Sequence, residues 1–482
     1  MKVIFIISFI LLNQLFAQNT TFSKIYSTEL DESLRDVIED SLGNFYFVGY
    51  NASPGNAYTK TNGFILKTNN LGEELNSVTH ISADTSIEYY YIFNDGQNHL
   101  DVSGCLSTDF IWPHTNSSFT LSKISNQLEL VKKKKYVLPQ DYGLSYLKTR
   151  KAFNNNYLFV SYVWNASNFL LNPVFLRTNE NFDSLRLFTN VNYGRAGEDI
   201  KQLDENSYWF LSSLGDVQIL DSLFIPTGQF SKIPEGLSSA FGIEWDSDTS
   251  FYLLGSWDNE GADDIGFVRQ LSPLDTNDVT FNTFGFLDTL DYPASFGGLS
   301  YQNHDSIFIG GTKDFWIGYY NNWPSWFFVL QTDSMLNIRW ERFYGGDAYY
   351  VMTKLKATKD GGCIAIGDRY DYKNTTEEER DIYILKLNSE GLLTNTPEKP
   401  QIQMHEALVF PNPGTNYLKV RVAAQYPQST FELYDINGNK ILSKSITGKW
   451  GRVETTFLPR GSYVYKIYNQ KGLYETGKWV KQ

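Results

Sequence analysis

Short strand-like runs of mostly apolar residues, separated by turn residues, are the dominant pattern in this chain. One clear run, Phe45–Tyr50, follows a turn at Asp40–Asn44, and a second, Gly63–Asn69, follows a variable loop. A turn at Gly72 and another short run complete the unit. Short apolar runs bounded by Asp, Asn and Gly are typical of strands joined by tight turns. The pattern therefore predicts an all-β protein.

The order of strands and turns in this unit recurs through the body of the chain. The first copy, Asp36–Leu75, and the last, Leu355–Leu393, match each other best. The weaker copies are Tyr89–Leu138, Tyr146–Gly194, Asp199–Ile233, Phe241–Gly285 and Ser295–Tyr344. Seven copies with four strands each predict a seven-bladed β-propeller, because a blade is a four-stranded sheet. The copies resemble the bacterial β-propeller repeat family. An array of β-sandwiches is the competing architecture, but it gives no reason for a period of four strands.

The two ends of this body complement each other. The last copy stops at Thr394 without a fourth strand, whereas Thr21–Ser27 aligns with the fourth strand of the sixth copy, Ile338–Tyr344. An N-terminal strand that completes the last blade would remove an exposed sheet edge. We therefore expect the ring to be closed by the first strand of the chain.

The last 78 residues, His405–Gln482, show a different set of motifs. Four short alternating runs are separated by turn residues, and a hairpin is predicted where Asn437-Gly438 joins two of the runs, because this dipeptide accepts positive φ readily. The pattern predicts a small antiparallel β-sandwich. The residues that define the motifs are Pro411, Asn412, Pro413, Gly414, Asp435, Gly438, Gly461 and Tyr463.

These motifs, in this order and running to the final residue, resemble the type A C-terminal sorting domain of the type IX secretion system of Bacteroidetes. An ordinary immunoglobulin-like module would show a similar strand pattern. The resemblance implies that the secretion translocon and a sortase recognise this segment. It also implies delivery through the periplasm to the cell surface or the medium.

The N-terminus is typical of a signal peptide. Lys2 is followed by an apolar stretch, Val3–Leu12, and by a small residue, Ala17, at the expected cleavage site. This stretch is shorter than the roughly 20 residues that a membrane-spanning helix needs. We therefore expect no transmembrane segment and four parts: a signal peptide at 1–18, a propeller at 19–394, a linker at 395–404 in which the sortase cuts, and the sorting domain at 405–482.

Charge is distributed unevenly between these parts. The chain carries a formal charge of −13, of which His405–Gln482 contributes +6 and Lys2 contributes +1, so the residues between them carry −20. An acidic body argues against nucleic acid as a partner, because phosphate binding needs clustered cations. The one basic run, Lys132–Lys135, is expected to be a solvated strand edge.

Catalytic and metal-binding motifs are absent from the sequence. The five histidines lack zinc-site spacing, and no serine-hydrolase or nucleotide-binding fingerprint is present. No cofactor is expected, with one alternative: Asp258–Asp264 supplies the oxygen ligands that calcium prefers, but it lacks the alternating spacing of a calcium loop, so a solvated acidic turn is favoured. Cys105 and Cys363 fall in separate copies, and we expect two unpaired, buried thiols.

The candidate ligand-binding residues are aromatic and lie in predicted loops: Trp257, Trp316, Tyr319, Tyr320 and Trp323. In a propeller the loops between second and third strands share one face, and such loops often carry function. Here they are Asn51–Asn62, Leu106–Asn116, Trp164–Asn172, Trp257–Asp264, Lys313–Trp323 and Arg369–Glu379. Exposed aromatic rings suit sugars or a protein partner. The sequence thus favours a binding or adhesion module for glycan or protein; the alternative is an extracellular hydrolase or lyase.

Overall fold

The computed structural model divides the chain into two compact units, Met1–Pro397 and Glu398–Gln482. It describes residues 20–482 apart from internal gaps, so the expected signal peptide and linker lie outside the described residues. The residues left out are 1–19, 56–59, 96–97, 109–115, 139–141, 166–170, 190–196, 213–215, 233–236, 248–249, 260–261, 273, 286–288, 317, 319, 376, 395–406, 423–427, 437, 449 and 470–471.

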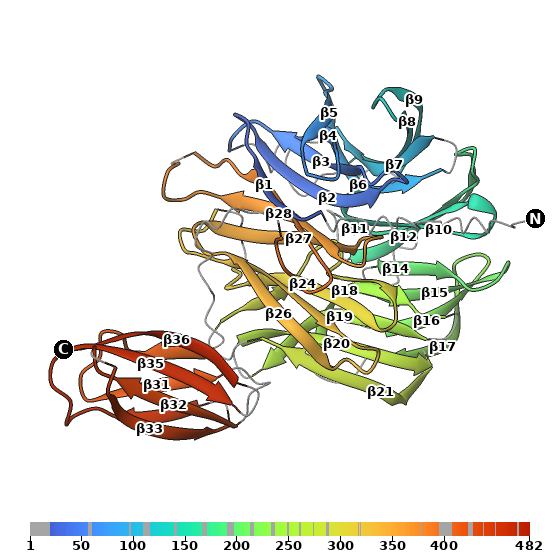
Figure 1. Cartoon of the computed structure of the whole chain (residues 1–482). Coiled ribbons are helices and arrows are strands. Elements are labelled where there is room, and N and C mark those ends of the chain that lie inside the picture. The colour runs from blue at the N-terminus through green and yellow to red at the C-terminus, as the bar shows by residue number, and fades with distance from the viewer. Residues whose placement is uncertain are drawn as a thin grey trace, which may run out of the picture. The chain divides into compact units, whose positions relative to one another are not determined.

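The described residues form β-strands and one short 3-10 helix, Phe153–Asn155, which confirms the all-β prediction. The described part of the first unit contains seven antiparallel sheets (Figure 1). The first three are β2 (Asp31–Glu39), β3 (Phe45–Ala52), β4 (Asn62–Thr68) and β5 (Glu74–His80); β6 (Ser86–Asn94), β7 (His99–Ser107), β8 (Ser117–Ser125) and β9 (Leu130–Val137); β10 (Tyr142–Lys151), β11 (Tyr157–Asn165), β12 (Leu171–Thr178) and β13 (Ser184–Thr189).

The remaining four sheets follow in chain order. They are β14 (Gly197–Gln202), β15 (Ser207–Ser212), β16 (Asp216–Asp221) and β17 (Pro226–Lys232); β18 (Leu237–Trp245), β19 (Phe251–Asn259), β20 (Ala262–Ser272) and β21 (Asp275–Phe284); β22 (Asp291–Pro293), β23 (Leu299–Asn303), β24 (Ser306–Lys313), β25 (Trp326–Thr332) and β26 (Ile338–Gly345); β27 (Tyr349–Ala357), β28 (Cys363–Tyr370), β29 (Asp381–Leu387) and β1 (Phe22–Tyr26).

The sheets are arranged as a closed ring. The first strands of successive sheets contact one another in the order β2, β6, β10, β14, β18, β23 and β27, and β27 contacts β2 again. The second strands are buried between neighbouring sheets, and β3 accordingly is buried at every position and apolar except at Asn51. The fourth strands lie outside, and Lys132–Lys135 of β9 are solvent-exposed as predicted. The first unit is therefore a β-propeller.

The ring is closed as the sequence predicts. Strand β1 pairs antiparallel with β29, from Phe22 opposite Lys386 to Tyr26 opposite Ile382. The backbone N–H of Thr394 donates a hydrogen bond of 2.6 Å to the Oγ1 of Thr21. The Phe22 ring is buried in a core that combines side chains of the last and the first sheet. The seam between these two sheets is thus held by strand pairing and by packing.

Most of the inner strands contain a β-bulge. The pairing register shifts once at Leu34/Asp36, Tyr89/Tyr91, Leu144/Tyr146, Gly197/Asp199 and Met352/Lys354, and twice in β18. A bulge changes the direction in which the following side chains point and increases the local twist. The side chains that follow these bulges can therefore gather around the axis of the ring.

The second unit is a sandwich of two sheets, which confirms the prediction for the tail. One sheet has the order β30 (Ala407–Phe410), β31 (Tyr417–Val422) and β34 (Trp450–Glu454); the other has the order β33 (Lys440–Thr447), β32 (Gln428–Tyr434), β35 (Gly461–Asn469) and β36 (Gly472–Lys481). Their facing side chains form one core, in which Phe431, Ile467 and Trp479 are fully buried.

The two cysteines are unpaired. Neither forms a disulfide; Cys363 in β28 is buried as expected, whereas Cys105 in β7 is only partly buried. Burial raises the pKa of Cys363 to about 12 and that of Cys105 further still. Because the thiolate is the reactive form, we expect no reaction with a thiol reagent in the folded protein at pH 8 and two reactive thiols in denaturant. Rapid labelling of the folded chain would contradict this expectation.

Candidate functional site

The predicted aromatic residues between β24 and β25 form a compact group on the loop. Trp316 is 53% exposed and Trp323 is 38% exposed. Their rings meet edge to face, with centroids 6.3 Å apart. Tyr319 lies outside the described residues, and Tyr320 is half-buried. The structure therefore brings two of the predicted residues together as a solvent-facing pair.

Hydrogen bonds and ring contacts with the protein hold this loop in place. Tyr349 of β27 donates from its hydroxyl to the Trp316 carbonyl at 2.8 Å and accepts from the Trp316 N–H at 3.1 Å. The Trp323 indole N–H donates to the carbonyl of Asp314 at 3.2 Å. Tyr320 packs edge to face against Tyr370, with centroids 5.3 Å apart. The loop packs on itself through Tyr320 and still presents Trp316 and Trp323 to solvent.

The prediction for Trp257 was wrong in its location. Trp257 lies within β19, opposite Asp264 of β20, and packs against Phe281 with ring centroids 4.4 Å apart. The hairpin ladder continues to Asn259 opposite Ala262, so the described residues of the expected loop at 257–264 lie in paired strands. In the β19–β20 hairpin, the hydrogen bonds between the strands outweigh the low strand propensity of Asp and Asn.

The candidate calcium turn falls partly on residues that the structure does not describe, namely 260–261 and the side chains of 258, 259 and 263. Over the described residues, no group of three or more His, Cys, Asp or Glu side chains is placed to hold a metal ion. Sections of the predicted loop face, including 56–59, 109–115 and 166–170, are likewise outside the described part.

The motif residues of the second unit have structural roles at its edges. Asn412 donates from its side chain to the Lys478 carbonyl at 2.7 Å and accepts from the Val480 N–H at 2.9 Å. Pro411 accepts from the buried Trp479 indole at 2.8 Å. The segment Pro411–Gly414, which includes Pro413, is therefore bonded to the last strand.

The remaining four motif residues lie at or next to turns. Asp435 accepts the Gly438 N–H on its carbonyl at 3.1 Å, and Gly438 has a φ of 85°, which favours glycine. The Tyr463 hydroxyl donates to the Pro459 carbonyl at 2.7 Å, next to Gly461 at the start of β35. The motif thus encodes the turns and the closing strand of the sandwich.

A cavity that the sequence did not predict lies near the axis of the propeller. It has a volume of about 450 Å³. Its walls are the ends of the inner strands, where Asn94, Lys151 and Lys356 stand opposite the first residues of the second strands. These ends are remote from the loops between second and third strands, so the cavity and the aromatic pair occupy different ends of the ring.

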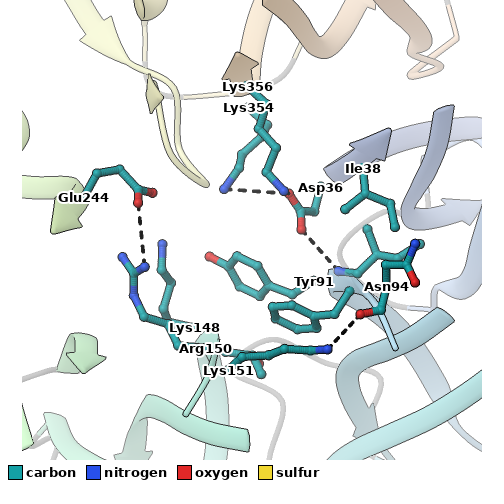
Figure 2. Close-up of a pocket in the computed structure, with 13 residues that line it drawn as sticks. Asp36, Ile38, Tyr91, Asn94, Lys148, Arg150, Lys151, Glu244, Lys354 and Lys356 are labelled. Atoms are coloured by element: carbon teal, nitrogen blue, oxygen red, sulfur yellow. Dashed lines mark hydrogen bonds and ion pairs between the residues drawn. The ribbon is translucent and has the colours of Figure 1, made fainter. Parts of the chain in front are cut away.

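Five cationic side chains line this cavity (Figure 2): Lys148, Arg150, Lys151, Lys354 and Lys356. The first three come from β10 and the other two from β27, on opposite sides of the cavity. Lys148 and Arg150, like Lys354 and Lys356, are two residues apart, the spacing that places side chains on one face of a strand. The side chains of Lys148 and Lys354 are only 6% and 8% exposed.

Carboxylates pair with most of these cations. Arg150 donates two hydrogen bonds to Asp199, at 2.6 and 2.7 Å, and Lys148 lies 3.6 Å from the same carboxylate. Asp36 lies 2.9 Å from the Lys356 Nζ and 3.8 Å from the Lys354 Nζ, and accepts the Ile92 N–H at 3.1 Å. The two carboxylates are thus each shared by two cations.

The comparison with protein families identifies the second unit. Residues 408–482 match the secretion system C-terminal sorting domain. The chain is therefore a type IX secretion protein, exported to the cell surface or the medium, with a β-propeller as its body. No helix within the described residues is long and apolar enough for a membrane crossing. The comparison with curated proteins gave no match.

Solved structures with similar architecture include a fungal alcohol oxidase of the AA5 family in complex with copper, with a TM-score of 0.46 and 9% identity over 96% of this chain and 99% of the oxidase. The WD40 propeller domain of Doa1 has a TM-score of 0.44 and 11% identity over 78% and 98%. YCF48 from Cyanidioschyzon merolae has a TM-score of 0.41 and 10% identity over 77% and 99%. Likeness at this level assigns no activity to the chain.

Proposed function

We propose that the exported propeller is a binding module that holds an extracellular glycan against Trp316 and Trp323. The observation that carries this proposal is the rigid exposure of the two indole rings. The Trp316 backbone N–H and the Trp323 indole N–H are already bonded within the protein, which holds the two exposed rings in position for a partner. Rigid aromatic side chains supply much of the contact energy in recognition at a low entropic cost.

The neighbourhood of the pair supports a neutral ligand. Asp347 of the adjacent blade is more than half exposed, although it lies 3.5 Å from Arg369, and the body as a whole is acidic. An anionic polymer would be repelled by such a surface. A pyranose ring can instead stack on an indole and use its hydroxyl groups towards nearby carbonyl and carboxylate oxygens.

We expect the double substitution Trp316→Ala and Trp323→Ala to weaken polysaccharide binding by about 2 kcal/mol or more, the loss typical of aromatic anchors at a binding centre. Affinity electrophoresis through gels containing xylan, mannan, starch or hydroxyethylcellulose measures this. Phe153→Ala is a matched control, because Phe153 is an exposed aromatic residue (48%) at the other end of the ring.

Retention of full binding by the double variant would refute the proposal. Release of reducing ends from any of these polymers by the wild type would instead favour the alternative, a hydrolase or lyase built on the propeller. Binding only to a protein from the cell envelope would make the pair a protein-docking site.

A further inference from the structure

We propose that the axial cavity is a second binding site, independent of the aromatic pair, and that it takes a small, sugar-sized organic anion bearing a carboxylate, phosphate or sulfate group. The anion is held between Lys148 and Arg150 of β10 and Lys354 and Lys356 of β27, the two sets of cations that face each other across the cavity (Figure 2).

The charge balance of the cavity is the first argument. Four cations share two buried carboxylates, Asp36 and Asp199, while the third carboxylate, Glu244, lies 3.8 Å from Arg150 and is 40% exposed. Lys151 adds a fifth cation at the rim, where it donates to the Asn94 carbonyl at 2.7 Å. The described walls therefore carry an excess of positive charge inside a strongly acidic body. Fixed charge in a low-dielectric recess attracts the opposite charge far more than it does in water.

The position of the two buried ammonium groups is the second argument. The Nζ atom of Lys148, from β10, lies 5.3 Å from the centroid of the Tyr91 ring, and the Nζ atom of Lys354, from β27, lies 5.2 Å from it. They are close enough that Lys148 disfavours the charge on Lys354. Burying two like charges together is costly. An anion placed between them would offset this repulsion.

The geometry also suits a ligand of limited size. A volume of about 450 Å³ falls within the range of small-molecule sites and exceeds what a single inorganic ion requires. The guanidinium of Arg150 is fixed by its two hydrogen bonds to Asp199, and the ammonium group of Lys356 is fixed by its ion pair with Asp36. Such prearranged cations bind an anion with little loss of side-chain entropy.

Burial, opposed by Asp36, lowers the pKa of Lys354 to about 7. The other charged or titratable groups around it are Lys148, Lys356, Glu244 and Tyr91, from four strands. An anion favours the protonated amine, so binding should weaken as pH rises through 7. Binding at pH 8 should also take up protons, which calorimetry in buffers of different ionisation enthalpy detects.

Isothermal titration of the purified chain with four related sugars tests the proposal: galacturonate, galactose 6-phosphate, galactose 6-sulfate and neutral galactose, at constant ionic strength. We expect at least one anionic sugar to bind and galactose to fail. Lys148→Met and Lys354→Met should each weaken binding about tenfold or more, the loss typical of a desolvated charge contact. Which sugar binds identifies the anionic group.

The variants are chosen to keep the fold. After Lys354→Met, Asp36 retains Lys356, and after Lys148→Met, Asp199 retains Arg150. Lys386→Met is the matched control, because Lys386 is equally buried and ion-paired with Asp360 at 2.8 Å but lies outside the cavity. Lys354→Arg should restore binding. The Trp316 and Trp323 double variant should bind the anion normally, which separates this site from the aromatic pair.

Two results would overturn the proposal. One is that none of the anionic sugars binds more tightly than galactose to the wild type, a result that needs no variant. The other is equal binding by the wild type, Lys148→Met and Lys354→Met, with urea unfolding used to show that the variants are folded.

Discussion

Replacing Arg380 by methionine should destabilise the propeller by about 3–5 kcal/mol, the usual loss when one member of a buried ion pair is removed. The Arg380 side chain is 1% exposed at the seam between the last and first blades. Its guanidinium donates to Asp31 at 2.6 and 2.8 Å, to Asp368 at 2.9 Å and to the Tyr50 hydroxyl at 3.0 Å. Without it, two buried carboxylates lose their principal cationic partner.

Urea unfolding monitored by tryptophan fluorescence measures the loss. Arg339→Met is the control, because Arg339 is an exposed arginine of the same unit and should change stability by less than about 1 kcal/mol. Comparable losses in the two variants would show that the seam does not depend on this ion pair.

The loss of folding stability in Arg380→Met should also depend on pH. Burial raises the pKa of Asp368 to about 6 even with Arg380 beside it. In the wild type the folded state therefore binds more protons than the unfolded state between about pH 4 and 6, and stability falls as pH rises through this window. Removing Arg380 raises the pKa of this carboxyl further. The difference between variant and wild type should thus shrink as pH is lowered from 7 to 5.

Deleting Phe410–Gln482 should abolish export in the native host and leave the propeller folded. The reason is that strand pairing between β1 and β29 and the bond between Thr21 and Thr394 close the ring without the tail. Fractionation with antibody detection should find the truncated protein in the periplasm, and its urea transition should match that of the propeller in the full chain.

A point variant provides a second test of the same expectation. Trp479 is fully buried in the second unit, and Trp479→Ala should destabilise that unit by about 3–5 kcal/mol and reproduce the export defect. Surface display of the deletion variant would disprove the sorting role of the tail, whereas its failure to fold would disprove the independence of the propeller.

Much of the fold was predictable because its signals are local. The turn at Asp40–Asn44 and the hairpin at Asp435–Gly438 are each stabilised by hydrogen bonds between residues only three or four positions apart in the sequence. Even ring closure, a distant contact, could be predicted because the last repeat lacks a strand that the N-terminus supplies. The aromatic loop was equally visible, since Trp316 and Trp323 have no packing role in a strand.

The axial cavity could not be found in this way. Lys148 and Lys354 are far apart in sequence, and each alone looks like an ordinary lysine on a solvated strand. Only the ring places β10 and β27 across one space, and only the bulges direct their side chains into it. A weak signal was present nonetheless: cations occur at alternate positions, 148 with 150 and 354 with 356, near the ends of two strands that begin with mostly apolar residues.

The pairing of β1 with β29 has a consequence for the order in which the protein is made. Ser23 and its hydrogen-bond partner Tyr383 are 360 residues apart, so nearly the whole propeller is synthesised between β1 and the strand that pairs with it. Joining them directly in an unfolded chain would cost about 5 kcal/mol in loop entropy alone. This entropic cost becomes smaller once the intervening blades have folded, because they bring the two strands close together. We therefore expect closure to be the last step of assembly, and a chain interrupted before residue 381 to lack β29, the pairing partner of both β1 and β28.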